Sequence, residues 1–206
     1  MVLKKHILII TGILVLAGIF SSFRPELGLS RRHLRKIDKA IAKTWNDDSL
    51  NKELIYLPAS IFNSHMINPS VEVSRLKSTT ESKGYLVVQK AKGCKIGGCD
   101  ESSCLLGECL PQHPKTNYEE FIYSIIYNNQ LEILDVSVIE YTSEHGFEIC
   151  NKSWLKQFVG SKSDDVSVGK SIDAISGATV SVQSISTSIH QTGLFMIDVR
   201  NLDHSK

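Results

Sequence analysis

A loop and a helix start near the C-terminus combine residue types that could hold a phosphate. Residues 171–186 read SIDAISGATVSVQSIS, in which Gly177 interrupts regular structure before an amphipathic stretch. We therefore predict a helix that begins near Thr179. Its apolar face is expected to consist of Val182, Ile185 and Ile189, with Ser181, Ser184, Ser188 and Gln191 pointing elsewhere. The first backbone N–H groups of a helix lack intrahelical acceptors and favour an anion, so these residues fit either a phosphate site at Thr179 or a simple helix cap made by Ser176 or Thr179.

A second group of residues that could do chemistry consists of four evenly spaced cysteines, in the stretch CKIGGCDESSCLLGEC. They are Cys94, Cys99, Cys104 and Cys109. Structural zinc sites generally pair cysteines two to four residues apart, and this spacing matches no familiar metal pattern well. We consider structural disulfides first, then a redox-active dithiol, then a metal or cluster site with these four residues as ligands. A fifth cysteine, Cys150, is expected to be a small buried hydrophobic residue.

The composition is that of an ordinary globular domain with a small partner. The chain has 206 residues, of which 42% are hydrophobic and 22% charged. Its 23 Lys and Arg nearly balance its 22 Asp and Glu, and no basic stripe with interleaved aromatic residues appears, so nucleic acid is not an expected partner. No paired carboxylates and no nucleophile with a spaced base stand out, which disfavours an enzyme with its own substrate pocket.

The N-terminus reads as an export signal. Residues 1–23 place Lys4 and Lys5 ahead of an uncharged apolar run over 7–20, the order found in a signal peptide or an N-terminal membrane anchor. The basic segment RRHLRK at 31–36 opposes this orientation, because positive charge beyond an apolar run favours the cytoplasmic side. We expect an extracytoplasmic protein, either exported or anchored to the cell membrane.

The remaining chain predicts an α+β fold, with an antiparallel sheet packed against helices. We divide it into an N-terminal helix with a mixed segment, 24–83, and a C-terminal domain, 84–206. Helices are expected over 30–45, with Ser30 as the N-cap, over 148–158, and from Thr179. Strands are expected over 84–91, 120–129 and 130–141, forming a meander. The turn at 128–130 suits a hairpin, because asparagine tolerates positive φ.

The stretch 173–179, DAISGAT, resembles the flavinylation signature of the FMN-binding domain family. The segment 138–160 also resembles the strand, loop and helix that precede this signature in small members, so the resemblance covers about the last 90 residues. It implies that a separate, magnesium-dependent flavin transferase takes FMN from FAD and esterifies its phosphate to Thr179. By position, the loop recognised by the transferase consists of Asp173, Ser176, Gly177 and Ala178. The family also places near the flavin the residues Tyr141, His145, Gly146 and Phe147.

Two functions follow from these patterns. The resemblance implies a covalent FMN carrier for extracytoplasmic electron transfer, with an unidentified membrane redox partner. The alternative is an exported module that contains disulfides or binds a metal, in which the SGAT stretch only caps a helix. The residue types support the first function chemically, because a phosphoester needs a hydroxyl group and small neighbours such as Gly177 and Ala178 leave it accessible.

Overall fold

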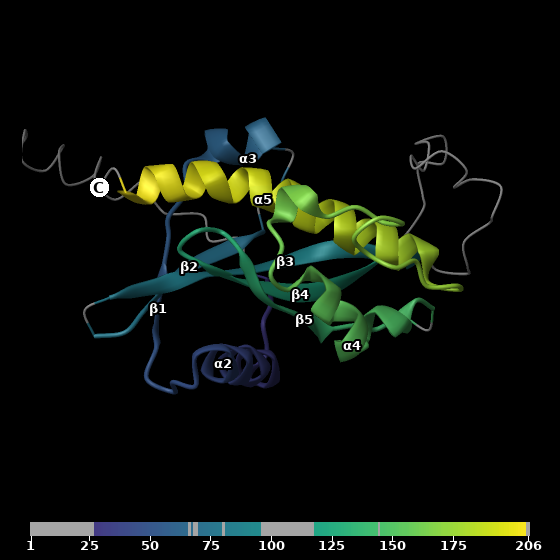
Figure 1. Cartoon of the computed structure of the whole chain (residues 1–206), viewed down its shortest axis with the longest axis horizontal. Coiled ribbons are helices and arrows are strands. Elements are labelled where there is room, and N and C mark those ends of the chain that lie inside the picture. The colour runs from purple at the N-terminus through teal and green to yellow at the C-terminus, as the bar shows by residue number, and fades with distance from the viewer. Residues whose placement is uncertain are drawn as a thin grey trace, which may run out of the picture.

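An antiparallel sheet between two helical layers forms the fold, in the computed structural model of the chain. The structure describes residues 27–65, 67, 70–79, 81–95, 118–143 and 145–204. A long C-terminal helix covers one face of the sheet and an N-terminal helix covers the other (Figure 1). The predicted α+β fold is confirmed.

The elements follow one another in a simple order. The strands are β1 (Asn51–Leu54), β2 (Glu72–Lys77), β3 (Ser82–Lys95), β4 (Tyr118–Asn128) and β5 (Ile133–Glu140). They lie in chain order in one sheet, and each is antiparallel to its neighbour. The α-helices are α2 (Arg31–Trp45), α3 (Ala59–His65), α4 (Lys152–Leu155) and α5 (Thr179–His204). The described residues also form the 3-10 helices η2 (Phe147–Cys150), η3 (Lys156–Phe158) and η4 (Ser163–Asp165).

Helix α2 begins where the sequence predicts. The Ser30 hydroxyl accepts from the His33 N–H at 3.3 Å while the His33 ring accepts from the Ser30 N–H, a reciprocal cap that satisfies two groups at the helix start. The helix ends at Asn46, whose left-handed φ of 52° stops propagation. Ile37 and Ile41 are buried against the sheet, so this helix closes one of its two faces.

Strand β4 is buried on both faces, which explains its nearly continuous apolar sequence. Alternate side chains enter the core beneath α5: Phe121, Tyr123, Ile125 and Tyr127. The intervening side chains Ile122 and Ile126 enter the second core, beneath α2. A strand at the centre of a sheet covered on both sides has no solvent face, so it loses the alternation of polar and apolar residues.

The hairpin between β4 and β5 forms at the predicted place for a different reason. The Asn128 side chain accepts from the N–H groups of Gln130 and Glu132, each at 2.9 Å, and so builds the turn through its own oxygen. The positive φ falls on Leu131, at 63°, and not on an asparagine.

The single helix predicted over 148–158 is wrong. The segment forms η2, α4 and η3 in succession, because Asn151 is extended, with ψ at 119°, and restarts the chain as an N-cap. Its side-chain oxygen accepts from the Ser153 N–H at 2.9 Å. Cys150 therefore lies at a break between two short helices and is exposed, not buried as the helical pattern suggested.

Parts of the sequence-based organisation fall outside the described residues. The leader or anchor predicted over 1–23 is one of these parts, as are Cys99, Cys104 and Cys109. Among the described residues, no helix combines the length and the apolarity needed to cross a bilayer. The sheet draws strands from both sides of residue 84, since β1 and β2 precede it.

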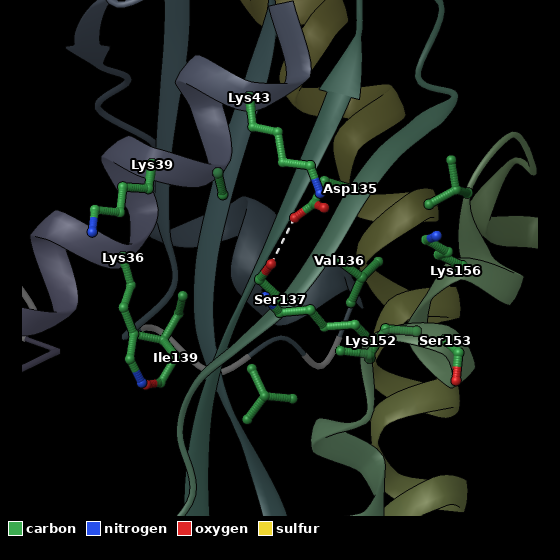
Figure 2. A pocket seen from close by; sticks show the side chains of 14 residues that line it. Lys36, Lys39, Lys43, Asp135, Val136, Ser137, Ile139, Lys152, Ser153 and Lys156 are labelled. Carbon is green, nitrogen blue, oxygen red and sulfur yellow. Dashed lines mark hydrogen bonds between the residues drawn. The ribbon is translucent and has the colours of Figure 1, made fainter.

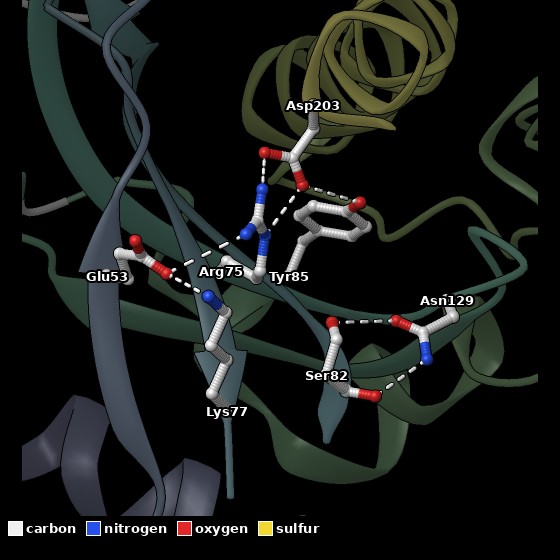
Figure 3. Close-up of polar contacts among 7 residues, drawn as sticks. All are labelled: Glu53, Arg75, Lys77, Ser82, Tyr85, Asn129 and Asp203. Atoms are coloured by element: carbon white, nitrogen blue, oxygen red, sulfur yellow. Dashed lines mark hydrogen bonds and ion pairs between the residues drawn. The ribbon is translucent and has the colours of Figure 1, made fainter. Parts of the chain in front are cut away.

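A buried ion pair fixes the C-terminal end of α5 to the sheet (Figure 3). Arg75 of β2 donates from Nε to Asp203 Oδ2 at 2.7 Å and also contacts the second carboxylate oxygen. The Tyr85 hydroxyl donates to the same carboxylate at 3.2 Å. The Asp203 side chain is only 6% exposed, so it depends on these donors for its charge to be tolerated. On its outer side Arg75 lies 3.7 Å from the exposed Glu53.

Replacing Arg75 with alanine should therefore destabilise the fold. Arg75→Ala leaves the Asp203 carboxylate buried without its cation, and we expect the free energy of unfolding to fall by about 2–4 kcal/mol. Urea unfolding followed by circular dichroism measures this change. The control is Glu53→Gln, which removes an exposed carboxylate shared by Arg75 and Lys77 and should leave the midpoint nearly unchanged, because exposed ion pairs contribute little. Equal midpoints for both variants would show that the pair does not hold α5.

Candidate functional site

The signature loop ends where helix α5 begins. Gly177 adopts a φ of +82°, and the next residue, Ala178, is completely buried. The Ala178 N–H donates to the Ile175 carbonyl at 3.1 Å, and its own carbonyl accepts the first helical bond, from Val182 at 2.9 Å. Thr179 is thus the first residue of α5, and it is exposed. The prediction of a helix start at Thr179 is confirmed.

Two side chains from the neighbouring helices clamp the backbone of the loop. The Trp154 indole donates to the Asp173 carbonyl at 2.9 Å, and the Gln157 side-chain oxygen accepts from the Asp173 N–H at 2.9 Å. Both peptide groups at Asp173 are held in this way, while the residue itself stays exposed. Ser176 and Gly177 are also exposed, so the loop is fixed at its start and open at its tip.

A second loop, residues 141–147, packs against the first turn of α5 through Ser181. The Tyr141 hydroxyl lies 2.9 Å from the Ser181 hydroxyl and also donates to the His145 carbonyl. Since a tyrosine has one hydroxyl proton, Ser181 is the donor in their contact. Gly146 has a φ of +79°, and a Cβ atom there would lie 2.3 Å from Ser181 Oγ. Glycine is therefore required for this close approach.

The structure gathers the residues predicted to lie near a flavin at one end of α5. Tyr141 and Gly146 contact Ser181, His145 contributes its carbonyl to the same cluster, and Phe147 follows directly. His145 is exposed, and Phe147 is 59% exposed, which leaves an aromatic surface beside the helix start. Contact of these four residues with a flavin stays a prediction.

Several polar residues that the pattern placed away from the apolar face of α5 prove to be engaged. Ser181 is fully buried, and Ser188 accepts from the buried Tyr123 hydroxyl at 2.7 Å. The helical pattern counts serine as polar and therefore as outward-facing, but each hydroxyl here contacts a tyrosine, Tyr123 in β4 or Tyr141 directly after β5. Trp154, Gln157 and Ser181 had no sequence signal, because their partners lie 16 to 40 residues away along the chain.

A buried polar network fixes the middle of α5. The Gln89 amide donates to Tyr123 and to Thr192, both at 2.5 Å, and the Thr192 hydroxyl donates to the Ser188 carbonyl at 2.6 Å. Burial raises the pKa of Tyr123 well above its usual value, so its hydroxyl stays neutral and remains a donor. Because unpaired buried polar groups are costly, these contacts oppose sliding of α5 along the sheet.

The cysteine segment contributes no described cluster. Cys94 lies within β3, near its end, while its three companions lie outside the described residues. Within the described part of the chain, no group of three or more His, Cys, Asp or Glu side chains is placed to hold a metal ion. The predictions for these cysteines therefore remain, in order, structural disulfides, a redox-active dithiol and a metal site.

Substitution of Gly146 tests the contact between the two loops. Gly146→Ala adds a Cβ that collides with Ser181 Oγ and carries an unfavourable positive φ, so we expect an unfolding free energy lower by about 2–4 kcal/mol. The matched control is Gly160→Ala, where φ is +85° but nothing lies within 4 Å of the added Cβ. The unfolding free energy of that variant should fall by only about 1 kcal/mol, because only the backbone conformation is strained. Chemical denaturation measures the unfolding free energy of both variants. An equally large decrease for Gly160→Ala and Gly146→Ala would contradict the close contact between Gly146 and Ser181.

Comparison with known families bears on this site directly. Residues 119–192 match the model of the FMN-binding domain. A search of curated proteins finds no match to the chain. The matched segment begins in β4 and ends in α5, so it contains the loop 141–147, the clamped signature loop and Thr179. The resemblance drawn from the residues is confirmed, and the segment 119–192 of this chain is an FMN-binding domain.

Proposed function

We propose that this chain is an exported or membrane-anchored flavoprotein that carries FMN through a phosphoester to Thr179 and acts in extracytoplasmic electron transfer. One observation carries the proposal: inside the FMN-binding domain, an exposed threonine is the first residue of a long helix. A hydroxyl at this place is accessible from outside and lies beside the positive end of the helix dipole.

The residues around Thr179 suit attachment of a phosphate. Ala178 is small and buried, and a Cβ at Gly177 would meet nothing within 4 Å, so the loop tip is unobstructed. A flavin transferase can therefore reach Thr179 Oγ1, which displaces the AMP portion of FAD and loses its proton as the phosphoester forms. The first-turn N–H groups of α5 can bind the remaining phosphate oxygens. The chain thus fits FMN at this position.

The neighbouring residues would hold the cofactor in place. FMN supplies one-electron and two-electron transfer when bound, and the protein contributes packing and hydrogen bonds. Trp154 and Gln157 hold the loop that presents Asp173 to the transferase. Phe147 offers an exposed ring to pack against the flavin, whereas the Tyr141 hydroxyl is already occupied by Ser181 and His145.

The proposed location rests on the N-terminal sequence. Residues 1–23 carry two lysines followed by an apolar run, as expected for a signal peptide or a membrane anchor. A flavin outside the cytoplasm then exchanges electrons with a redox partner in the membrane. Covalent attachment suits that location, because a cofactor lost there would diffuse away from the cell.

Substitutions of Thr179 test the attachment. Thr179→Ala removes the only oxygen available for esterification at this position, so the folded protein should retain no flavin on a denaturing gel. Thr179 is exposed and is the first residue of α5, not its N-cap, so the free energy of unfolding should change by no more than about 0.5 kcal/mol. Thr179→Ser restores the hydroxyl and should give reduced but detectable labelling. Flavin fluorescence in the gel, after co-expression with a flavin transferase, measures each variant.

Ser176→Ala is the matched control for this experiment. It removes an exposed hydroxyl three residues away, in the loop that the transferase recognises, and should keep some flavin fluorescence because its oxygen is not the acceptor. Fluorescence of Thr179→Ala equal to that of the unmodified protein would place the covalent link elsewhere. A colourless wild-type protein containing zinc would favour the alternative function.

The orientation is tested by a reporter fused after Lys206 that is active only outside the cytoplasm. We expect an active fusion, because residues 4–20 resemble an export signal. Removing the charges of Lys4 and Lys5 should lower its activity. A well-expressed but inactive fusion would show that the basic segment 31–36 retains the protein in the opposite orientation.

A further inference from the structure

A groove lies on the side of the sheet away from the flavin site. It is bounded by α2 on one side and by α4 and η3 on the other, and β5 forms its floor (Figure 2). Its volume is about 680 Å³, within the range of small-molecule binding sites. Helices α2 and α5 cover opposite faces of the sheet, so the groove is distinct from the helix start at Thr179 (Figure 1).

Lysines line this groove in two rows, one on each of its sides. Its five lysines are Lys36, Lys39, Lys43, Lys152 and Lys156, and its one acidic residue is Asp135. Figure 2 shows the first three on α2 and the last two on α4 and η3. Their spacing of three or four residues places the members of each row on one face of a helix.

The lysines lack carboxylate partners in the part of the chain that the structure describes. The salt bridges found there involve none of the five. Lys36 donates to the Ile139 carbonyl at 2.6 Å, and the Asp135 carboxylate accepts the Ser137 hydroxyl at 2.7 Å. Like charges three and four residues apart on a helix repel one another. A bound anion would relieve this repulsion.

Between the lysines the groove is apolar. Its hydrophobic lining includes Val136, Ile139 and Leu155, which are buried in the cores of the sheet, and the more exposed Ala40, Val138 and Val159. Val159 is 44% exposed, although most valines are buried. A purely inorganic anion would leave this surface in water, whereas a molecule with both an anionic group and an apolar chain would satisfy both parts of the groove.

We propose that the groove binds an anionic phospholipid, with its phosphate among the lysines and an acyl chain along the apolar floor. The choice of a lipid rests on the membrane location in the proposed function. Helix α2 begins 11 residues after the apolar run 7–20, so its first residue lies no more than about 40 Å from the end of that run, even along an extended chain. Lysines that come within about 10 Å of a membrane surface are attracted to anionic headgroups, and this length of chain allows α2 to approach that surface.

Titration with short-chain lipids tests the site without requiring insertion into a bilayer. The full chain, held in neutral phosphatidylcholine nanodiscs, is titrated with dihexanoylphosphatidic acid by calorimetry. We expect saturable binding that weakens as salt is raised. Dihexanoylphosphatidylcholine should bind at least about ten-fold more weakly, because its headgroup carries no net charge, and inorganic phosphate should also bind more weakly, because it lacks the chain.

Variants separate the two parts of the groove. Lys39→Gln with Lys156→Gln should weaken binding of phosphatidic acid by about ten-fold or more, since each lysine near an anionic lipid contributes about 1 kcal/mol. The control is Lys83→Gln with Lys170→Gln, which removes the same charge outside the groove and should leave affinity unchanged. Val159→Ser should weaken phosphatidic acid about three-fold and leave inorganic phosphate unaffected.

The outcomes distinguish this proposal from the flavin proposal. Absence of binding, equal affinity for the two lipids, or an equal effect of the groove and control pairs would overturn the lipid site. Inorganic phosphate binding as tightly as phosphatidic acid would overturn the lipid and leave only an anion site. The variant Lys39→Gln with Lys156→Gln should retain flavin fluorescence on a denaturing gel. Lipid binding and flavin attachment can therefore fail independently of each other.

Discussion

Strands β3 and β4 carry apolar side chains on both faces, and the rest of the fold must cover both of these faces. Strand β4 contributes to the core beneath α5 and to the core beneath α2. Each face must be covered, because an exposed apolar sheet surface of this extent would drive aggregation. Helix α5 covers one face along its length and brings Thr179 to one end of the sheet. Helix α2 covers the other face and contributes the lysines of the groove.

Apolar burial alone would let α5 shift along the sheet, because the hydrophobic effect is not directional. Polar contacts at three levels prevent that shift: Ser181 with Tyr141, Thr192 with Gln89, and Asp203 with Arg75. Each contact pairs a group on the helix with one from a strand or from a strand end. The position of Thr179 is therefore determined by contacts distributed over the whole helix.

Much of the fold could be predicted from local sequence, and the relations between distant segments could not. The cap at Ser30 and the helix start at Thr179 depend on neighbouring residues, and both were predicted. The helical periodicity over 148–158 concealed the break at Asn151, because a side-chain cap leaves no change in hydrophobic pattern. The burial of Ser181 and the groove were not predictable, since their partners come from segments 40 to over 100 residues apart.

The length of α5 is constrained because contacts hold both of its ends. From Thr179 to Asp203 the helix extends about 36 Å, at 1.5 Å per residue, with the signature loop at one end and a buried ion pair at the other. Inserting or deleting one residue between them would turn one end by about 100° relative to the other. Either the threonine or the aspartate would then face the wrong way. Substitutions can therefore accumulate along the exposed side of α5, whereas changes in its number of residues cannot, and differences in chain length belong in the loops.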